Sequence, residues 1–147
     1  MMDKKKILYI LRGVPGSGKS TYAKQIMENR VDAVGEHYEA DMYFTDGDNY
    51  YWSADKLFYA HKWCYFSVCK AMDKPSNDYV IVSNTFVTTK DIKPYVKAAQ
   101  ERGWEVSVLR FSNRFQNVHS VPPDVVQSML DKFQDYEGEI KIPIANV

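Results

Sequence analysis

Short apolar runs alternate with segments of helical periodicity along most of the chain. Several runs are rich in β-branched or aromatic residues and end at turn-forming residues, which is typical of buried strands in a parallel sheet. The strand candidates are residues 7–11, 79–83 and 104–111, with a weaker candidate at residues 31–41.

Between these runs, apolar residues recur three or four positions apart, which predicts amphipathic helices. Thr88, with Asp91 three residues later, is typical of a helix N-cap, and Gly103 is placed to end the same helix. This alternation of strands and helices favours an α/β fold, a parallel sheet with helices on both faces. The other predicted helices are residues 21–30, 54–72 and 122–133.

The length and composition are consistent with one globular domain. The chain has 147 residues, of which 45% are hydrophobic, enough to form a core. It carries 19 Lys and Arg against 19 Asp and Glu, and this balance argues against non-specific coating of nucleic acid. No apolar run approaches the ~20 residues that span a bilayer, and two cysteines fit a reduced compartment better than a disulfide framework. We therefore expect a cytoplasmic protein with a single domain over residues 1–147 and no membrane association.

A glycine-rich motif directly follows the first predicted strand. Residues 13–20 match G-x-x-x-x-G-K-[ST] at every fixed position. In a loop between a strand and a helix, backbone N–H groups can surround the phosphates of a nucleotide, and the helix N-terminus favours their negative charge. The motif therefore predicts a nucleoside-triphosphate site. Its residues are Gly13, Pro15, Gly16, Ser17, Gly18, Lys19, Ser20 and Thr21.

Two side chains of this motif have distinct expected roles. Lys19 would contact the β- and γ-phosphates, and the hydroxyl of Ser20 would bind Mg²⁺. The predicted cofactors are therefore ATP and Mg²⁺. The motif leaves the destination of the γ-phosphate open, because water, a small-molecule hydroxyl and a polymer hydroxyl are all candidate acceptors.

Asp41 is a candidate general base at the end of the second strand candidate. Phosphoryl transfer to an alcohol requires a group that orients the hydroxyl and accepts its proton. Ligands of open α/β sheets bind at the carboxyl ends of the strands, which would place Asp41 beside the phosphate-binding loop. Its position alone fits equally well a residue that caps the turn into Met42–Phe44.

With these residues in place, the chain resembles the small P-loop kinases typified by the kinase domain of phage polynucleotide kinase, and related AAA-type kinases. Five segments carry the similarity, in order along most of the chain. They are residues 7–21 with the Walker A motif, Ala40-Asp41-Met42-Tyr43, residues 80–85, residues 102–106 and residues 121–129.

The resemblance implies a P-loop NTPase fold and an ATP-dependent kinase activity. It implies that Asp41 is the general base and that Thr85 lies on the acceptor side of the site. It also implies a lid over residues 110–120, with an arginine that contacts the transferring phosphates.

The chain departs from the family pattern at two places. The third strand ends in Ser83-Asn84, where an acidic Walker B residue often stands, so a carboxylate for Mg²⁺ is missing or comes from elsewhere. Gln116 stands near the expected lid arginine, so Arg114 or Arg110 would take that role.

Ten aromatic residues lie between positions 43 and 66. Base stacking on an aromatic ring contributes roughly 1–3 kcal/mol per base, so this segment could hold a nucleoside or the end of a strand. For five loop residues, stacking on an acceptor and packing are equally open. These are Tyr43, Phe44, Tyr50, Tyr51 and Trp52. The helical spacing of four others favours core packing. These four are Phe58, Tyr59, Trp63 and Phe66.

Three functions remain in view from the sequence. The first is an ATP-dependent kinase that phosphorylates a nucleic-acid 5′ end or a nucleotide-like acceptor. The missing Walker B acid favours a second, a nucleotide-dependent binding or regulatory module that hydrolyses ATP slowly. The zero net charge and the short acceptor region favour a third, a small-molecule kinase that acts on a sugar nucleotide, as zeta-toxin-like relatives do.

Overall fold

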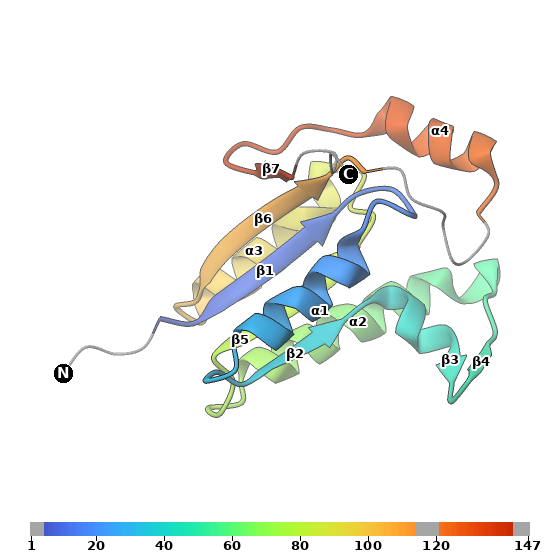
Figure 1. The fold of residues 1–147 in the computed structure, drawn as a ribbon. Helices are drawn as coiled ribbons and strands as arrows, with labels where there is room; N and C mark the ends of the chain where they lie inside the picture. The colour runs from blue at the N-terminus through green and yellow to red at the C-terminus, as the bar shows by residue number, and fades with distance from the viewer. Residues whose placement is uncertain (1–4, 114–120, 143–147) are drawn as a thin grey trace.

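β1 (Ile7–Arg12) is the central strand of a five-stranded parallel sheet in the computed structural model, which describes residues 5–113 and 121–142. Its neighbours are β5 (Tyr79–Asn84) and β6 (Glu105–Phe111). The edge strands are β2 (Gly35–Tyr38) and β7 (Ile140–Ile142), which gives the order β2-β5-β1-β6-β7. Because the strands run in one direction, their carboxyl ends meet on one side of the sheet, to the right in Figure 1.

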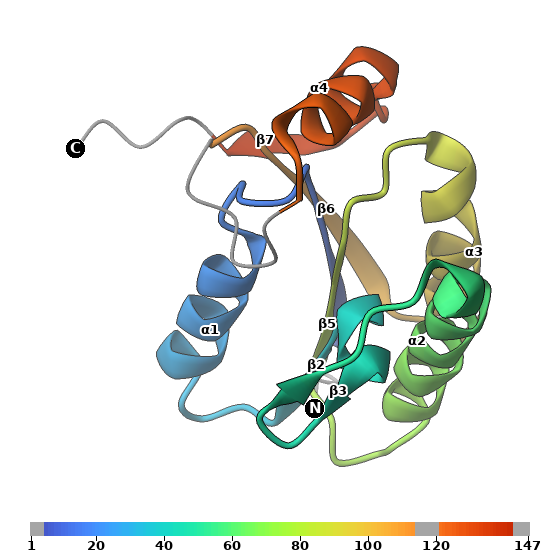
Figure 2. The same cartoon turned by 90° about the vertical axis from the view of Figure 1, so that its right-hand side faces the viewer.

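Helices cover both faces of this sheet, as the alternating pattern predicts (Figure 2). α1 (Lys19–Asn29) lies on one face, whereas α2 (Leu57–Met72) and α3 (Thr89–Glu101) lie on the other. α4 (Pro123–Lys132) lies on the side where the strands end. The α/β fold with helices on both faces is therefore confirmed.

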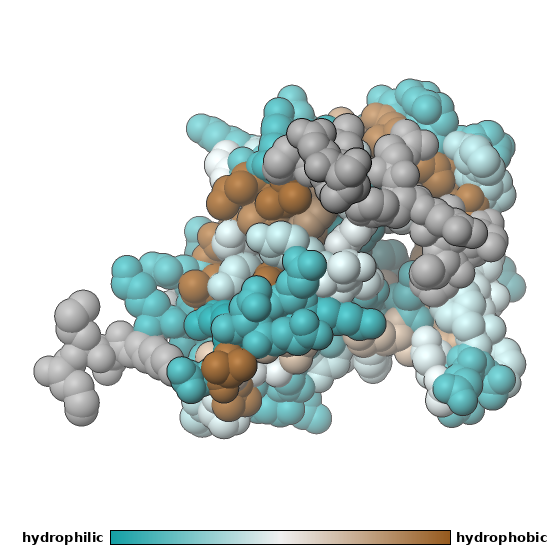
Figure 3. Space-filling view, viewed as in Figure 1, coloured by the Kyte–Doolittle hydropathy of each residue, from teal (hydrophilic) through white to brown (hydrophobic). Residues whose placement is uncertain are grey.

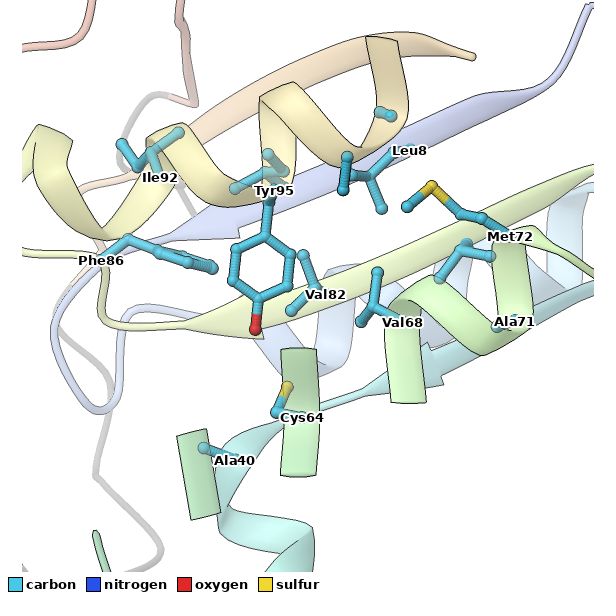
Figure 4. Packing of buried hydrophobic residues seen from close by; sticks show 14 of the residues in the cluster. Leu8, Ala40, Cys64, Val68, Ala71, Met72, Val82, Phe86, Ile92 and Tyr95 are labelled. Atoms are coloured by element: carbon cyan, nitrogen blue, oxygen red, sulfur yellow. The ribbon is translucent and has the colours of Figure 1, made fainter. Parts of the chain in front are cut away.

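Alternate residues of the strands enter two separate hydrophobic cores. β1 contributes Leu8 and Ile10 to the core beneath α2 and α3, and Leu11 to the core beneath α1. Figure 4 shows the first core, where Val68 and Met72 of α2 belong to the same buried cluster as Leu8. The two cores hold the central strand, and thereby the loop that follows it, from both sides.

The α1 face of the sheet keeps an open groove of about 340 Å³ beside the helix. It is lined by side chains of α1, β1 and β6, among them Tyr9, Tyr22 and Leu109. Figure 3 shows this face, with hydrophobic side chains gathered over β6 and β7 next to the polar surface of α1.

The aromatic residues of α2 do not form its buried stripe. Phe58, Tyr59 and Phe66 are 67%, 58% and 60% exposed, so the expectation that they pack in the core is wrong. Trp63 does pack, partly buried, against the core. The residues that α2 buries are instead mostly small ones. These are Ala60, Cys64, Val68, Ala71 and Met72.

A small antiparallel hairpin precedes α2. Beyond β2, the 3₁₀-helix η1 (Ala40–Phe44) leads into β3 (Thr45–Asp46) and β4 (Asn49–Tyr50), and η2 (Ala54–Lys56) leads into α2. The turn predicted at residues 46–49 is the tip of this hairpin, with Gly47 at φ +63°. The second strand is shorter than the predicted range of 31–41, so Asp41 lies in η1 just beyond the strand.

α3 ends as its sequence predicts. Gly103 has φ +72°, its N–H donates to the Gln100 carbonyl, and the Trp104 N–H donates to the Ala99 carbonyl. This is a Schellman motif, which satisfies carbonyls at the end of the helix. At the other end Thr88 is the N-cap residue, but its hydroxyl donates to the Asp91 carboxylate rather than capping a backbone N–H.

The segment after α4 adds β7, which the sequence pattern did not predict because three residues carry too little periodicity. A buried ion pair fixes this segment to the centre of the sheet. The Arg12 guanidinium donates to Glu139 at 2.7 Å and to the Phe86 carbonyl, and the Phe133 ring lies 4.3 Å from it. Arg110 donates to the other oxygen of Glu139.

No helix within residues 5–113 and 121–142 is both long and apolar enough to cross a membrane.

Candidate active site

The glycine-rich motif forms the loop between β1 and α1, as predicted. Gly16 and Gly18 have φ of +82° and +99°, in the left-handed region that favours glycine. At Gly13 the restriction is space, because an added Cβ would lie 2.4 Å from Ser17 Oγ and 2.9 Å from the Phe111 carbonyl oxygen. The loop also bonds to β5, since the Gly13 N–H donates to the Thr85 carbonyl at 3.1 Å.

Lys19, the first residue of α1, folds its side chain back into this loop. Its ammonium donates to the Gly13 carbonyl at 2.7 Å and to the Val14 carbonyl at 3.0 Å. Burial lowers the pKa of Lys19 to about 8, and the negative charges of Glu39 and Asp41 offset part of this shift. The charges of both carboxylates therefore act on the lysine that occupies the loop.

Ser20 meets a carboxylate that the motif does not contain. Its hydroxyl donates to Glu39 Oε1 at 2.6 Å. Glu39 lies one residue beyond β2, so the hydrogen bond joins the start of α1 to the carboxyl end of an edge strand. A charge-assisted hydrogen bond of this length is a strong one.

Asn84 stands at the end of β5, where an acidic residue was expected in the family pattern. Its side-chain oxygen accepts a hydrogen bond from the Ala40 N–H at 2.8 Å, and its amide lies 3.6 Å from Cys64 Sγ. Asn84 is only 8% exposed. It therefore fixes the backbone between Glu39 and Asp41 instead of offering a carboxylate.

Asp41 lies in η1, on the same side of the sheet as the phosphate-binding loop. Its Oδ1 accepts a hydrogen bond from the Tyr50 hydroxyl at 3.1 Å. Burial, together with the charge of Asp41, raises the pKa of Tyr50 to about 12, so this hydroxyl stays protonated. The hairpin thus contacts the predicted base directly.

The aromatic candidates for an acceptor surface divide by exposure. Phe44 is 4% exposed and its ring lies 6.3 Å from that of Tyr50, whereas Tyr43 is 40% exposed. Phe44 therefore supports exposed rings from beneath. We call the exposed rings of the hairpin and α2 the aromatic surface. Its members are Tyr43, Tyr50, Tyr51, Trp52, Phe58, Tyr59 and Phe66.

The predicted lid over residues 110–120 is described only at its start. Residues 110 and 111 belong to β6, and Arg114 and Gln116 lie outside the described residues. Arg110 is held in ion pairs with Asp135 and Glu139, under the segment that follows α4. Those ion pairs engage the Arg110 side chain in the described part of the chain.

Two side chains of the site were missed by sequence reasoning: Glu39 and His37. A weak signal existed for the first, since Glu39 and Asp41 are separated by one residue directly after a strand. His37 lies between Glu39 and β5, with its Nε2 at 2.8 Å from Ser83 Oγ and 3.4 Å from Glu39 Oε1.

Residues 8–134 match a family described as AAA domain. The chain belongs to this AAA domain family. A protein of Pasteurella multocida (strain Pm70), itself uncharacterised, is 32% identical to this AAA domain over 147 residues, 92% of this chain and 82% of that protein. NEDD4-binding protein 2 of Homo sapiens is 28% identical over 149 residues, 94% of this chain, and the chain spans only 8% of that protein's length.

Solved structures, kinases among them, have the same fold as this AAA domain. The Pnkp1/Rnl/Hen1 complex matches with a TM-score of 0.59 and 23% identity over 87% of this chain and 40% of that chain. A gluconokinase from Sinorhizobium meliloti 1021 matches with a TM-score of 0.59 and 15% identity, over 95% and 81% of the two chains. The Mycobacterium tuberculosis APS kinase CysC, in complex with AMPPNP and APS, matches with a TM-score of 0.62 and 11% identity, over 99% and 91%. The AAA domain therefore has the fold of P-loop kinases.

Proposed function

We propose that this protein is an ATP-dependent phosphotransferase that moves the γ-phosphate to a hydroxyl of a nucleic-acid 5′ end or a nucleotide-like acceptor. One observation carries the proposal. The phosphate-binding loop with Lys19 and the carboxylate of Asp41 both follow the carboxyl ends of parallel strands, and the charge of Asp41 offsets part of the lowering of the Lys19 pKa by burial. A nucleotide cradle and a base on one side of a parallel sheet are the two parts that transfer to an alcohol requires.

The residues of the loop would bind and orient the nucleotide. Its backbone N–H groups and the N-terminus of α1 favour the negative phosphates. Lys19 would exchange its bonds to the Gly13 and Val14 carbonyls for phosphate oxygens. Ser20 would hold Mg²⁺, which when bound neutralises charge on the β- and γ-phosphates.

Asp41 would act on the acceptor. Its carboxylate would accept the proton of the acceptor hydroxyl as that oxygen bonds to the γ-phosphorus, and the bond from the γ-phosphorus to the bridging oxygen breaks to release ADP. The Tyr50 hydroxyl, which donates to Asp41 Oδ1, would hold the carboxylate in place. An arginine of the 110–120 lid, Arg114 in the first instance, would contact the transferring phosphoryl group.

The acceptor class follows from what surrounds Asp41. The aromatic surface includes Tyr50, whose hydroxyl contacts Asp41, and exposed rings of this kind can stack on a base. Nucleic-acid ends and nucleotides both carry a nucleobase close to the reacting hydroxyl. Among structures of the same fold, one belongs to an RNA repair complex that includes Pnkp1, and another is an APS kinase bound to AMPPNP and APS.

A second candidate function is a nucleotide-binding regulatory module without an acceptor. It is favoured by one observation, the Asn84 side chain at the end of β5, where a Walker B carboxylate would stand.

The test is a γ-phosphate transfer assay with labelled Mg·ATP and a panel of acceptors. The panel compares oligonucleotides with 5′-hydroxyl ends, free nucleosides, nucleotides and sugar nucleotides with a reaction that has no acceptor. Label on oligonucleotide ends, nucleosides or nucleotides supports the proposal. ATP binding with no label on any acceptor overturns it in favour of the regulatory module, and label on the sugar of a sugar nucleotide alone overturns its acceptor assignment.

A further inference from the structure

A hydroxyl and a carboxylate meet at the start of α1 in an arrangement that suits a hard cation. The Ser20 hydroxyl donates to Glu39 Oε1 at 2.6 Å, and the Glu39 side chain is 19% exposed. Mg²⁺ prefers oxygen ligands of this kind, and two oxygens already this close can both face one ion with little rearrangement. The donor set therefore fits the metal that the fold family uses.

The acidic Walker B residue that often follows the third strand in the family pattern is replaced here. β5 ends in Ser83 and Asn84, and Asn84 is committed to the Ala40 N–H. No group of three or more His, Cys, Asp and Glu side chains that could enclose a metal occurs within residues 5–113 and 121–142. Mg²⁺ does not need such an enclosure, because it keeps several waters and takes one or two protein oxygens beside the phosphates of a nucleotide.

His37 places the Glu39 carboxylate. The two residues are two positions apart, and Glu39 has extended backbone (φ −135°, ψ 145°), so their side chains lie on the same face. His37 Nε2 lies 2.8 Å from Ser83 Oγ and 3.4 Å from Glu39 Oε1. Nε2 makes its hydrogen bond with Ser83 Oγ on β5, and this bond holds the ring with Nε2 at ion-pair distance from Glu39 Oε1.

The contacts of Glu39 leave one oxygen for another partner. Ser20 and His37 both contact Oε1, and no hydrogen bond to Oε2 is found in the described part of the chain. A carboxylate held through one oxygen, with the other directed elsewhere, is the arrangement expected of an oriented metal ligand.

We propose that Glu39 supplies the carboxylate of the magnesium site that Ser20 begins, and that His37 is the positioning residue that orients it. This site rests on the proposed nucleotide binding and is independent of the acceptor. It replaces a carboxylate at the end of β5 with one at the end of β2, and it assigns Glu39 to the metal and Asp41 to the acceptor.

Binding of ADP and of the metal tests the site without any transfer reaction. Calorimetry would give the ADP Kd with Mg²⁺ and with EDTA, and electron paramagnetic resonance would follow Mn²⁺ titrated into the ADP complex. Mg²⁺ should tighten ADP binding by the parental protein. Glu39→Gln should lose most of that gain and weaken Mn²⁺ binding at least tenfold. In EDTA the same variant should bind ADP at least as tightly as the parent, because a negative charge near the phosphates is gone.

Glu39→Gln is thus expected to weaken ADP binding with Mg²⁺ but not with EDTA. This difference distinguishes a metal ligand from a structural role, because a damaged loop would weaken ADP binding under both conditions. Asp32→Asn, which removes an exposed carboxylate just before β2, is the matched control and should leave both measurements unchanged. Glu39→Ala repeats the test if the glutamine variant unfolds, with circular dichroism as the check on folding. Parental Mg²⁺ dependence in a folded Glu39 variant overturns the proposal.

The positioning role of His37 needs a different pair of variants. His37→Leu should lower the Mg²⁺ gain severalfold, and His37→Gln, whose amide can reach both Ser83 and Glu39, should restore most of it. Equal behaviour of the leucine and parental proteins overturns the role of His37. An intact Mg²⁺ gain that depends on Glu39, in a protein that transfers phosphate to no acceptor, would overturn the kinase proposal and support the metal site.

Discussion

At the scale of single residues, the lysine of the phosphate-binding loop combines two tasks that oppose each other. Lys19 must be enclosed to face the phosphates, yet enclosure disfavours its charge, which lowers its pKa to about 8. Glu39 and Asp41 limit this shift, so the carboxylates that serve metal and acceptor in our proposal also keep the lysine charged at neutral pH.

Nucleotide affinity should therefore depend on pH between pH 7 and pH 9, well below the pKa of an ordinary lysine. A bound nucleotide requires charged Lys19, so the ADP Kd rises with pH once the pH exceeds the pKa of the free protein. With that pKa at about 8, the Kd at pH 9 should be about tenfold higher than at pH 7. Calorimetry at the two pH values measures it. A Kd that is unchanged between them contradicts the environment described for Lys19.

Tyr50 is the residue through which the hairpin affects the predicted base. Its hydroxyl is 3.1 Å from Asp41 Oδ1 at an exposed site, so the bond is worth less than a buried one. Tyr50→Phe should lower kcat for transfer by about three- to tenfold and leave the ADP Kd unchanged. Tyr51→Phe, which removes a hydroxyl from a neighbouring exposed ring, is the control. A parental kcat in Tyr50→Phe would show that the Tyr50 hydroxyl has no effect on the predicted base.

The site residues that sequence predicts are those joined by a local motif. The loop from Gly13 to Thr21 can be predicted because the geometry of one turn fixes the spacing of its glycines, lysine and serine. The sequence shows Asn84 in place of an acid, but not its hydrogen bond to Ala40, which is 44 residues away. Glu39 escapes sequence analysis because its partner Ser20 is 19 residues away. Nothing in a single sequence distinguishes such an acid from an ordinary charged surface residue.

At the scale of elements, α2 shows where a hydrophobic pattern misleads. Large aromatic residues dominate the apolar signal of residues 57–72, yet the helix buries the stripe that contains Ala60 and Cys64. Small side chains let α2 lie close to the sheet, and several aromatic rings remain outside. Strands β1, β5 and β6 were predictable because nearly continuous apolar runs have one interpretation in a parallel sheet.

The burial of α2 can be tested by comparing two large side chains on it. Met72 is 4% exposed and Phe66 is 60% exposed. Met72→Ala should lower the free energy of unfolding by about 2–5 kcal/mol, as a buried cavity does, whereas Phe66→Ala should lower it by less than about 1 kcal/mol. Urea unfolding at pH 7 measures both. The opposite order would place the aromatic face of the helix against the sheet.

At the scale of the whole molecule, the ion pair between Arg12 and Glu139 joins residues 127 positions apart. Arg12 directly precedes the phosphate-binding loop, and its side chain is fully buried. Burial opposes the charge of Glu139, but the Tyr136 N–H, Arg12 and Arg110 outweigh it and lower the pKa of Glu139. The segment after α4 thereby stabilises the strand from which the loop begins.

Removal of this carboxylate should be costly, and the cost should depend on pH. Glu139→Gln leaves Arg12 buried beside a neutral group, so the free energy of unfolding at pH 7 should fall by about 3 kcal/mol. A carboxyl with a lowered pKa stabilises the fold fully above its unfolded value, near 4.5, and loses this effect as pH falls through the folded value. The difference in free energy of unfolding between variant and parent should therefore be smaller at pH 3 than at pH 7, as measured by urea titrations. An equal difference at both pH values contradicts this explanation.

The most direct test of the central claim compares the parental protein with Asp41→Asn in one set of measurements. The calorimetric Kd for ADP with Mg²⁺ establishes that the variant retains the phosphate-binding loop. Single-turnover transfer of labelled γ-phosphate to the best acceptor of the panel then measures the role of the carboxylate. We expect a Kd within about twofold of the parent and a transfer rate at least about 100-fold lower, the contribution of a general base. A variant that transfers phosphate at the parental rate would show that Asp41 is not the base.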